Sequence, residues 1–180
     1  AVVNGASSAG IELQANFAEI FGFENDLNPE IIFATQISSS IVDEYGFSEF
    51  WSWSGGLDTK SLEPLDLDLV AAFDASEAGG DTDLRRVVTI DETLLASPKF
   101  PQANGPDHDW IELRLADVIL LYAEALNENN NTAAALTELN KIRTRAGLSN
   151  STAATTGEIR QAIQDERRLE LAFEGQRWFD

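Results

Sequence analysis

The last helical segment of the sequence places acids where an apolar face is expected. Residues 159–173 put apolar side chains on one stripe of a helix, with Glu166 in the middle of the stripe and Glu170 beside it. A buried carboxylate is costly unless it is paired, and a planar guanidinium pairs with it through two hydrogen bonds. The candidate partners are Arg143, Arg145, Arg167, Arg168 and Arg177. We predict an ion-pair lattice that fixes how helices dock, in preference to a catalytic or metal-binding role.

A second group of side chains has the chemistry for binding sugars. Five aromatic residues fall close together and precede two glycines; they are Tyr45, Phe47, Phe50, Trp51 and Trp53. Aromatic faces pack against the C–H side of pyranose rings, and an extended backbone would point Trp51 and Trp53 to the same side. The segment predicts a ligand-binding platform. The alternative is that any one of these side chains packs on the hydrophobic core and covers it, without binding a ligand.

The other reactive groups form no complete catalytic or metal-binding motif. Asp81 with Asp83, and Asp107 with Asp109, could supply oxygen ligands to Ca²⁺, but neither pair has the spacing of a calcium loop. The chain has one histidine, His108, no cysteine and no G-x-S-x-G motif. These groups therefore predict no metal or cofactor site and no histidine-based catalytic triad. A glycosidase that uses two carboxylates across a sugar cleft is the alternative.

The charge of the chain excludes some classes of partner. The 180 residues carry a formal net charge of −19, which repels phosphate backbones and anionic lipids, so nucleic-acid binding and direct membrane binding are not expected. Residues 1–113 hold 21 acids and four basic residues, whereas residues 114–180 hold 10 acids and eight basic residues. We expect the acids of the first part to face solvent and the charges of the second part to form pairs.

Three helices should position the charged residues. Asp109 and Glu112 have the spacing of a capping box, as do Thr155 and Glu158, and Gly147 suits the end of a helix. Together with apolar periodicity, these signals predict helices over about 109–129, 132–147 and 155–175. The short connection between the first two makes them an antiparallel hairpin, and their sequence pattern is similar to that of a tetratricopeptide repeat.

The first part of the chain is interrupted by loop-forming residues. We predict a short amphipathic helix over 12–21, an extended segment after Pro29, a short helix over 67–73 and a loop over 97–109. The predicted fold is mostly α, in one domain over residues 1–180. Residues 1–111 form its loop-rich, ligand-side region with short extended segments, and residues 112–180 form its helical scaffold.

Three stretches of the helical part resemble a known family. They are LRLADVILLYAEALNE, LNKIRTRAGL and ERRLELAFEGQRWFD, and in order and spacing they are similar to the C-terminal part of SusD/RagB outer-membrane nutrient-binding lipoproteins. Weaker similarity reaches upstream, in NPEIIFATQ and DLVAAFDASEAGGDTDLRR. The resemblance implies a mostly helical SusD-like fold with tetratricopeptide-like hairpins. Because members of this family are far longer, it also implies a C-terminal fragment.

The resemblance implies a function without chemistry. It predicts binding of glycans or oligosaccharides at the extracellular face of the outer membrane, for import through a SusC-type TonB-dependent porin. The full-length protein would be held there by a lipid anchor outside these residues. A helical protein-interaction scaffold without glycan binding is the alternative.

Overall fold

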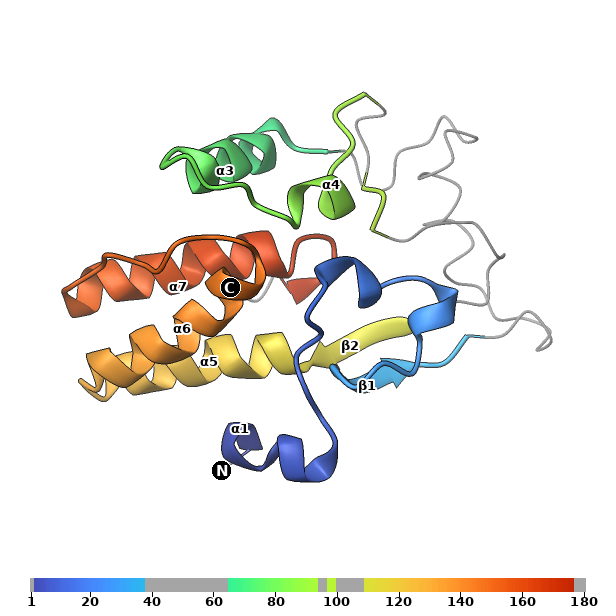
Figure 1. Ribbon diagram of the computed structural model, residues 1–180, viewed down its shortest axis with the longest axis horizontal. Coiled ribbons are helices and arrows are strands. Elements are labelled where there is room, and N and C mark those ends of the chain that lie inside the picture. The colour runs from blue at the N-terminus through green and yellow to red at the C-terminus, as the bar shows by residue number, and fades with distance from the viewer. Residues whose placement is uncertain (1, 38–64, 94–96, 100–108, 177–180) are drawn as a thin grey trace.

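Three long helices pack side by side in the C-terminal part of the chain (Figure 1). They are α5 (Leu115–Glu128), α6 (Thr132–Arg145) and α7 (Thr156–Glu170). The structure is a computed structural model that describes residues 2–37, 65–93, 97–99 and 109–176. No described helix has the length and apolar character needed to cross a membrane. The mostly helical fold predicted from the sequence is confirmed.

Small side chains bring α5 and α6 close together. Ala116, Ala123 and Ala135 are fully buried in a core that also contains Leu120, Leu139, Ile142, Ile159 and Ile163. The turn between the helices includes Asn130 at φ 61°, a left-handed conformation that asparagine tolerates. The predicted helical hairpin is present, and its likeness to a tetratricopeptide repeat stays a prediction.

The predicted start of α7 is confirmed, and its end differs from the prediction. The Thr155 hydroxyl accepts a hydrogen bond from the Glu158 N–H (3.2 Å), and the Glu158 carboxylate accepts one from the Thr155 N–H (2.9 Å). The helix ends at Glu170, before Phe173, whose φ is 64°. The turns that follow bring Glu174 back into the interior, where it is 4% exposed.

The first and second strands form a small sheet next to the start of α5. β1 (Ile31–Thr35) pairs antiparallel with β2 (Trp110–Arg114), with Ile31 opposite Arg114. The predicted extended segment after Pro29 is therefore confirmed. The predicted capping box at Asp109 is wrong, because the backbone after it pairs with β1 and the Asp109 carboxylate accepts a hydrogen bond from the Ile37 N–H (3.0 Å).

The remaining described elements are short, apart from one helix. α3 (Leu67–Glu77) confirms and extends the predicted helix over 67–73 and packs on α7. The others are α1 (Val2–Gly5), η1 (Ser7–Ala9), η2 (Phe17–Glu19), η3 (Phe23–Asn25) and α4 (Arg86–Thr89).

The helix predicted over 12–21 is absent, and only the single turn η2 forms there. The Glu12 N–H donates to the Pro29 carbonyl (3.0 Å), and the Gln14 N–H donates to the Glu30 carboxylate (2.8 Å). These bonds hold residues 12–14 beside the residues that lead into β1, so this part of the chain does not coil into a helix. The apolar side chains still pack inward, since Phe17, Ile20 and Phe21 are buried.

A glycine at the end of α6 carries the connection toward α7. The Gly147 N–H donates to the Thr144 carbonyl (3.1 Å) and the Leu148 N–H to the Arg143 carbonyl (2.9 Å), the paired bonds of a Schellman motif. Gly147 has φ 82°, and a Cβ placed on it would lie 2.9 Å from the Thr82 carbonyl oxygen. This position therefore needs glycine for both its conformation and its close contact.

Gly147→Ala should lower the free energy of unfolding by about 1–3 kcal/mol, because it adds both backbone strain and a clash with residue 82. Denaturant unfolding measures the difference. Gly157→Ala is the matched control, since Gly157 lies in α7 with open space around its Cα, and alanine there should be neutral or stabilising. Equal stability of the two variants would contradict this account of residue 147.

Candidate functional site

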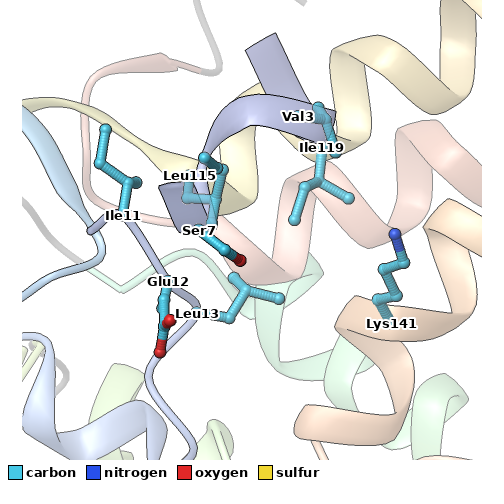
Figure 2. Close-up of a pocket in the computed structure, with 9 residues that line it drawn as sticks. Val3, Ser7, Ile11, Glu12, Leu13, Leu115, Ile119 and Lys141 are labelled. Atoms are coloured by element: carbon cyan, nitrogen blue, oxygen red, sulfur yellow. The ribbon is translucent and has the colours of Figure 1, made fainter. Parts of the chain in front are cut away.

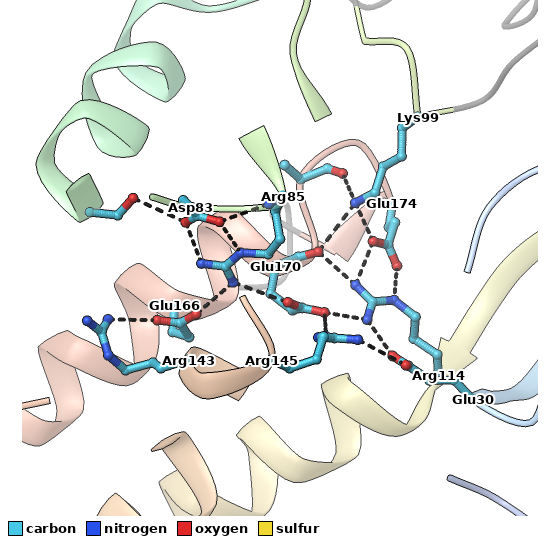
Figure 3. Close-up of polar contacts among 12 residues, drawn as sticks. Glu30, Asp83, Arg85, Lys99, Arg114, Arg143, Arg145, Glu166, Glu170 and Glu174 are labelled. Atoms are coloured by element: carbon cyan, nitrogen blue, oxygen red, sulfur yellow. Dashed lines mark hydrogen bonds and ion pairs between the residues drawn. The ribbon is translucent and has the colours of Figure 1, made fainter. Parts of the chain in front are cut away.

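Ten charged side chains from separate segments meet in the interior of the protein (Figure 3). We call this set the buried ion network. It contains five carboxylates, Glu30, Asp83, Glu166, Glu170 and Glu174, and five cations, Arg85, Lys99, Arg114, Arg143 and Arg145. The numbers of acids and bases are equal, so the network has no net formal charge.

Arg85 joins the upstream region to α7. Its guanidinium binds Asp83 (2.7 Å), Glu166 (2.6 Å) and Glu170 (3.1 Å), and its side chain is completely buried. Burial lowers the pKa of Arg85, but the charges of Glu166 and Glu170 and the hydrogen bonds to Asp83 raise it further, so the net pKa lies above its ordinary value. Arg143 binds the other oxygen of Glu166 (3.0 Å) from α6.

Glu170 lies at the centre of the network. Its carboxylate binds Arg85, Arg114 (2.5 Å) and Arg145, which come from three different segments. Burial raises the pKa of the Glu170 carboxyl, yet the attraction of Arg145, Arg114 and Arg85 outweighs burial and holds that pKa well below its usual range. Glu170 is therefore a fixed anion at any pH at which the protein would work.

Arg114 and Lys99 hold the turn that follows α7. Arg114 binds Glu174 through Nε (2.7 Å) and Nη2 (2.8 Å), and it also donates to the Glu170 carbonyl (2.7 Å). Lys99 binds the Glu174 carboxylate (2.5 Å) and the Ala172 carbonyl (2.8 Å). Burial raises the pKa of Glu174, but Arg114 and Lys99 lower it further, so this carboxyl too stays ionised.

The small sheet explains how Glu30 reaches the network. Glu30 precedes β1 and Arg114 ends β2, and antiparallel pairing sets them next to each other. The Glu30 carboxylate binds Arg114 (2.8 Å) and Arg145 (3.0 Å) and is completely buried. The aromatic rings of Phe17 and Phe21 cover this end, with the Lys99 ammonium 4.6 Å from the Phe21 ring centroid.

This arrangement suits a scaffold better than a catalytic site. A general acid must release a proton and a general base must accept one, but Glu170 and Glu174 have lowered pKa values and stay ionised, and the arginines keep their protons near neutral pH. In the described parts of the chain, no group of three or more histidine, cysteine or acidic residues is placed to hold a metal ion. The network joins β1, β2, α6, α7 and the segment before α4.

The predicted partners of Glu166 and Glu170 are only partly correct. Arg143 and Arg145 bind these acids as expected. Arg167 binds Asp117 on α5 instead (2.6 Å), Arg168 lines a pocket, and Arg177 lies outside the described residues.

Sequence reasoning identified four of the ten network residues, Glu166, Glu170, Arg143 and Arg145, and missed the other six. Arg85, Lys99 and Arg114 were not predicted as partners, and Glu30 and Asp83 are buried although the acids of residues 1–113 were expected to face solvent. That expectation is wrong for these two because each binds an arginine. The close spacing of Asp83 and Arg85 was the one local signal of such a pair.

The predicted sugar-binding residues stay a prediction. Tyr45, Phe47, Phe50, Trp51 and Trp53 lie outside the described residues, as do Asp107 and His108.

The described acids that could bind Ca²⁺ have protein partners. Asp81 accepts hydrogen bonds from the Ser149 N–H (2.8 Å) and hydroxyl (2.9 Å), and Asp83 binds Arg85. Asp109 accepts from Ile37, and its N–H donates to Asp26 (3.3 Å). Burial raises the pKa of Asp26 to about 6; the Asp109 N–H lowers that pKa and the Asp109 carboxylate raises it.

Two pockets lie elsewhere in the described residues; the first lies apart from the network, and the second borders it at Arg143 and Glu166. One, of about 400 Å³, is lined mainly by apolar side chains of the N-terminal segment and α5, with Lys141 reaching toward it from α6 (Figure 2). Lys141 already binds Glu138 (2.7 Å). The other pocket, of about 390 Å³, lies between α3 and α7 and contains two arginines.

Comparisons with known proteins agree on one family. The sequence model of the SusD family matches residues 84–180. A SusD-like protein of Bacteroides ovatus is 25% identical over 96% of this chain and 37% of its own length. A SusD-like protein of Formosa agariphila is 42% identical over 47% of this chain and 16% of its own length.

Solved structures share the fold. A SusD superfamily protein from Bacteroides vulgatus aligns with a TM-score of 0.72 at 18% identity, over 99% of this chain and 46% of that one. The surface glycan-binding protein A of Bacteroides uniformis aligns with a TM-score of 0.70 at 24% identity, over 99% of this chain and 42% of that one. The 180 residues thus span less than half the length of each of these relatives.

Glu166→Ala should lower the free energy of unfolding by about 3 kcal/mol, because it leaves buried Arg85 and half-buried Arg143 without a shared carboxylate. Thermal and denaturant unfolding measure this loss. Glu128→Ala is the control, since it removes a carboxylate from an exposed pair with Arg160 and should leave the melting temperature nearly unchanged. A Glu166→Ala melt that matches the natural chain would remove the lattice interpretation.

A buried lysine should give the protein a measurable pH dependence. Burial lowers the pKa of Lys99 from 10.5 to about 8, and the attraction of Glu174 offsets only part of this effect. Between these two values the unfolded chain holds a proton that the folded chain has lost, so stability rises with pH. Relative to Lys99→Met, the natural chain should gain up to roughly 3 kcal/mol of unfolding free energy across this range.

Denaturant unfolding at several pH values tests the effect of Lys99. Lys141→Met removes the same charge from an exposed position on α6 and serves as the control. Parallel pH profiles for the natural chain and Lys99→Met would show that Lys99 does not titrate in this way.

Proposed function

This chain belongs to the SusD family, and we propose from that membership that it serves in the non-enzymatic binding of glycans or oligosaccharides at the cell surface. The observation that carries the proposal is the family match over residues 84–180. The fold shared with a surface glycan-binding protein is in accord with it. Glycans captured in this way would be imported through a SusC-type TonB-dependent porin, the proposed partner.

The proposed division of labour places ligand binding outside the buried ion network. Residues 1–111 would form the ligand side and residues 112–180 the helical scaffold of one domain. The network acids support a binding role without catalysis, because their carboxylates are held by arginines and lysine and are not free for proton transfer. The protein would act at the extracellular face of the outer membrane, held by a lipid anchor outside these residues.

We propose that the aromatic segment supplies the sugar-binding surface. Tyr45, Phe47, Phe50, Trp51 and Trp53 combine flat apolar faces with neighbouring serines and acids, which suits pyranose rings and their hydroxyls.

The described residues on either side of this segment are well anchored. The Ile37 N–H is bound by Asp109, and Leu65 is buried against α3 and α7. A segment whose two ends are fixed loses less conformational entropy when it binds a ligand.

Replacing both Trp51 and Trp53 by alanine should weaken glycan binding by roughly tenfold or more, because indole faces provide much of the contact area with a sugar. The measurement is a glycan array, followed by titration of the best ligand, with the complete protein that contains these residues. Phe33→Ala is the control, since Phe33 is an exposed aromatic on β1 outside the segment.

Unaltered glycan binding by the double variant would disprove the proposal that the aromatic segment binds the sugar. Retention of a porin partner without binding of any glycan would favour the alternative function of a protein-interaction scaffold. Hydrolysis of labelled oligosaccharides by the purified protein would decide for an enzyme.

A further inference from the structure

The pocket between α3 and α7 has features of a separate binding site. We call it the α3–α7 pocket; its lining residues come from α3, α6 and α7. In Figure 1, α3 lies across the face of α7 that is turned away from α5, and the two helices share an apolar cluster that includes Phe73 and Leu169. Beside that cluster the helices face each other with alanines, Ala72, Ala75 and Ala162, which leave a volume of about 390 Å³. This volume is in the range of small-ligand sites.

Arg168 gives the pocket an unused cation. Its side chain lines the pocket and is half-buried on α7. None of the residues that the structure describes accepts a hydrogen bond or an ion pair from its guanidinium, although α7 and its neighbours are rich in acids. Every other arginine within the described ranges has a carboxylate partner. A half-buried guanidinium without a partner has five donors to offer to an incoming anion.

Arg143 adds further donors at the α6 side of the pocket. Its Nε donates to the Ser149 carbonyl (2.9 Å) and its Nη1 to Glu166 (3.0 Å), whereas its Nη2 has no acceptor among the described residues. The charge of Glu166 is already shared by Arg85 and Arg143. The pocket therefore presents guanidinium donors next to a carboxylate that is neutralised by its own partners.

The charges of the pocket favour an anion with a single negative charge. Asp165 is an exposed residue of the lining, and it would repel a dianion such as a phosphate monoester more strongly than a carboxylate. The planar fork of an arginine also matches the planar geometry of a carboxylate.

The other lining groups suit the remainder of a sugar acid. The alanine methyl groups form an apolar surface for the C–H face of a ring. The Ser76 hydroxyl can accept a hydrogen bond, and Asp165 uses only Oδ1, toward Gln161 (2.9 Å), so its second oxygen can accept from a ligand hydroxyl.

We propose that the α3–α7 pocket binds a carboxylated sugar unit, such as a uronic acid, with its carboxylate held by Arg168 and its ring against the alanines of α3 and α7. This site is distinct from the aromatic segment. The sugar part of the inference rests on the proposed function, whereas the carboxylate part rests on Arg168, whose donors have no acceptor among the described residues.

Calorimetric titration of the complete protein with glucuronate, glucose and acetate tests this inference. Glucuronate should bind at least tenfold more tightly than either of the other two, because only it offers both the charge and the ring. Arg168→Gln should weaken glucuronate binding by about tenfold or more. Arg160→Gln is the control, since it removes an arginine of the same helix that lies outside the pocket and binds Glu128.

A second variant keeps all charges and fills the space. Ala75 is exposed on α3, so Ala75→Leu should leave the fold intact and still block the pocket, with a loss of glucuronate binding similar to that of Arg168→Gln. Three results would overturn the inference: no binding of glucuronate, equal binding of glucose or acetate, or equal affinity of the Arg168→Gln and Arg160→Gln variants.

Failure of this inference can be told apart from failure of the proposed function. If a neutral glycan binds and depends on Trp51 and Trp53, while glucuronate does not bind, only the α3–α7 pocket is disproved. If glucuronate binds through Arg168 and no neutral glycan binds, the α3–α7 pocket is supported and the aromatic sugar-binding surface is disproved.

Discussion

A buried anion must have cations around it, and Glu170 imposes this constraint on the fold. Its carboxylate contacts Arg85, Arg114 and Arg145, which lie in the segment before α4, at the end of β2 and at the end of α6. An ionised carboxyl without partners in the interior would cost several kcal/mol, so these segments must come together for α7 to be buried. Because acids and bases in the network are equal in number, removing any member leaves an unbalanced buried charge.

The network also satisfies the backbone at the end of α7. A helix leaves its last carbonyls without partners. The carboxylates of Glu170 and Glu174 are also unfavourable at this end, because the helix dipole is negative there. Arg114 and Lys99 donate to the carbonyls of Glu170 and Ala172, so the same cations neutralise the acids and cap the helix. Arg143 and Arg145 in the last turn of α6 also have the sign that its dipole favours. The ends of two helices and of the small sheet are thus fixed around one set of charges.

The parts that the sequence predicted are those that depend on local pattern. α6, α7 and the pairing of Glu166 with Arg143 follow from helical periodicity, capping residues and the presence of acids on an apolar stripe. The roles of Glu30 and Arg114 depend on the pairing of strands that are far apart in the sequence, and no local signal indicates it. The residues after Asp109 fit a capped helix as well as a strand, and pairing with β1 decides for the strand. The aromatic residues 45–53 were found by composition, and their arrangement is a tertiary property that composition does not give.

The most direct test of the central claim is a double-mutant cycle between Arg85 and Glu166, which join the region before α4 to α7. Arg85→Leu, Glu166→Leu and the double variant would be unfolded in denaturant as the complete protein. If the network ties the two regions together, the double variant should be less destabilised than the sum of the single variants, with a coupling free energy of about 2 kcal/mol. Effects that add to within about 0.5 kcal/mol would contradict the account, because they would mean that the two residues stabilise the protein independently.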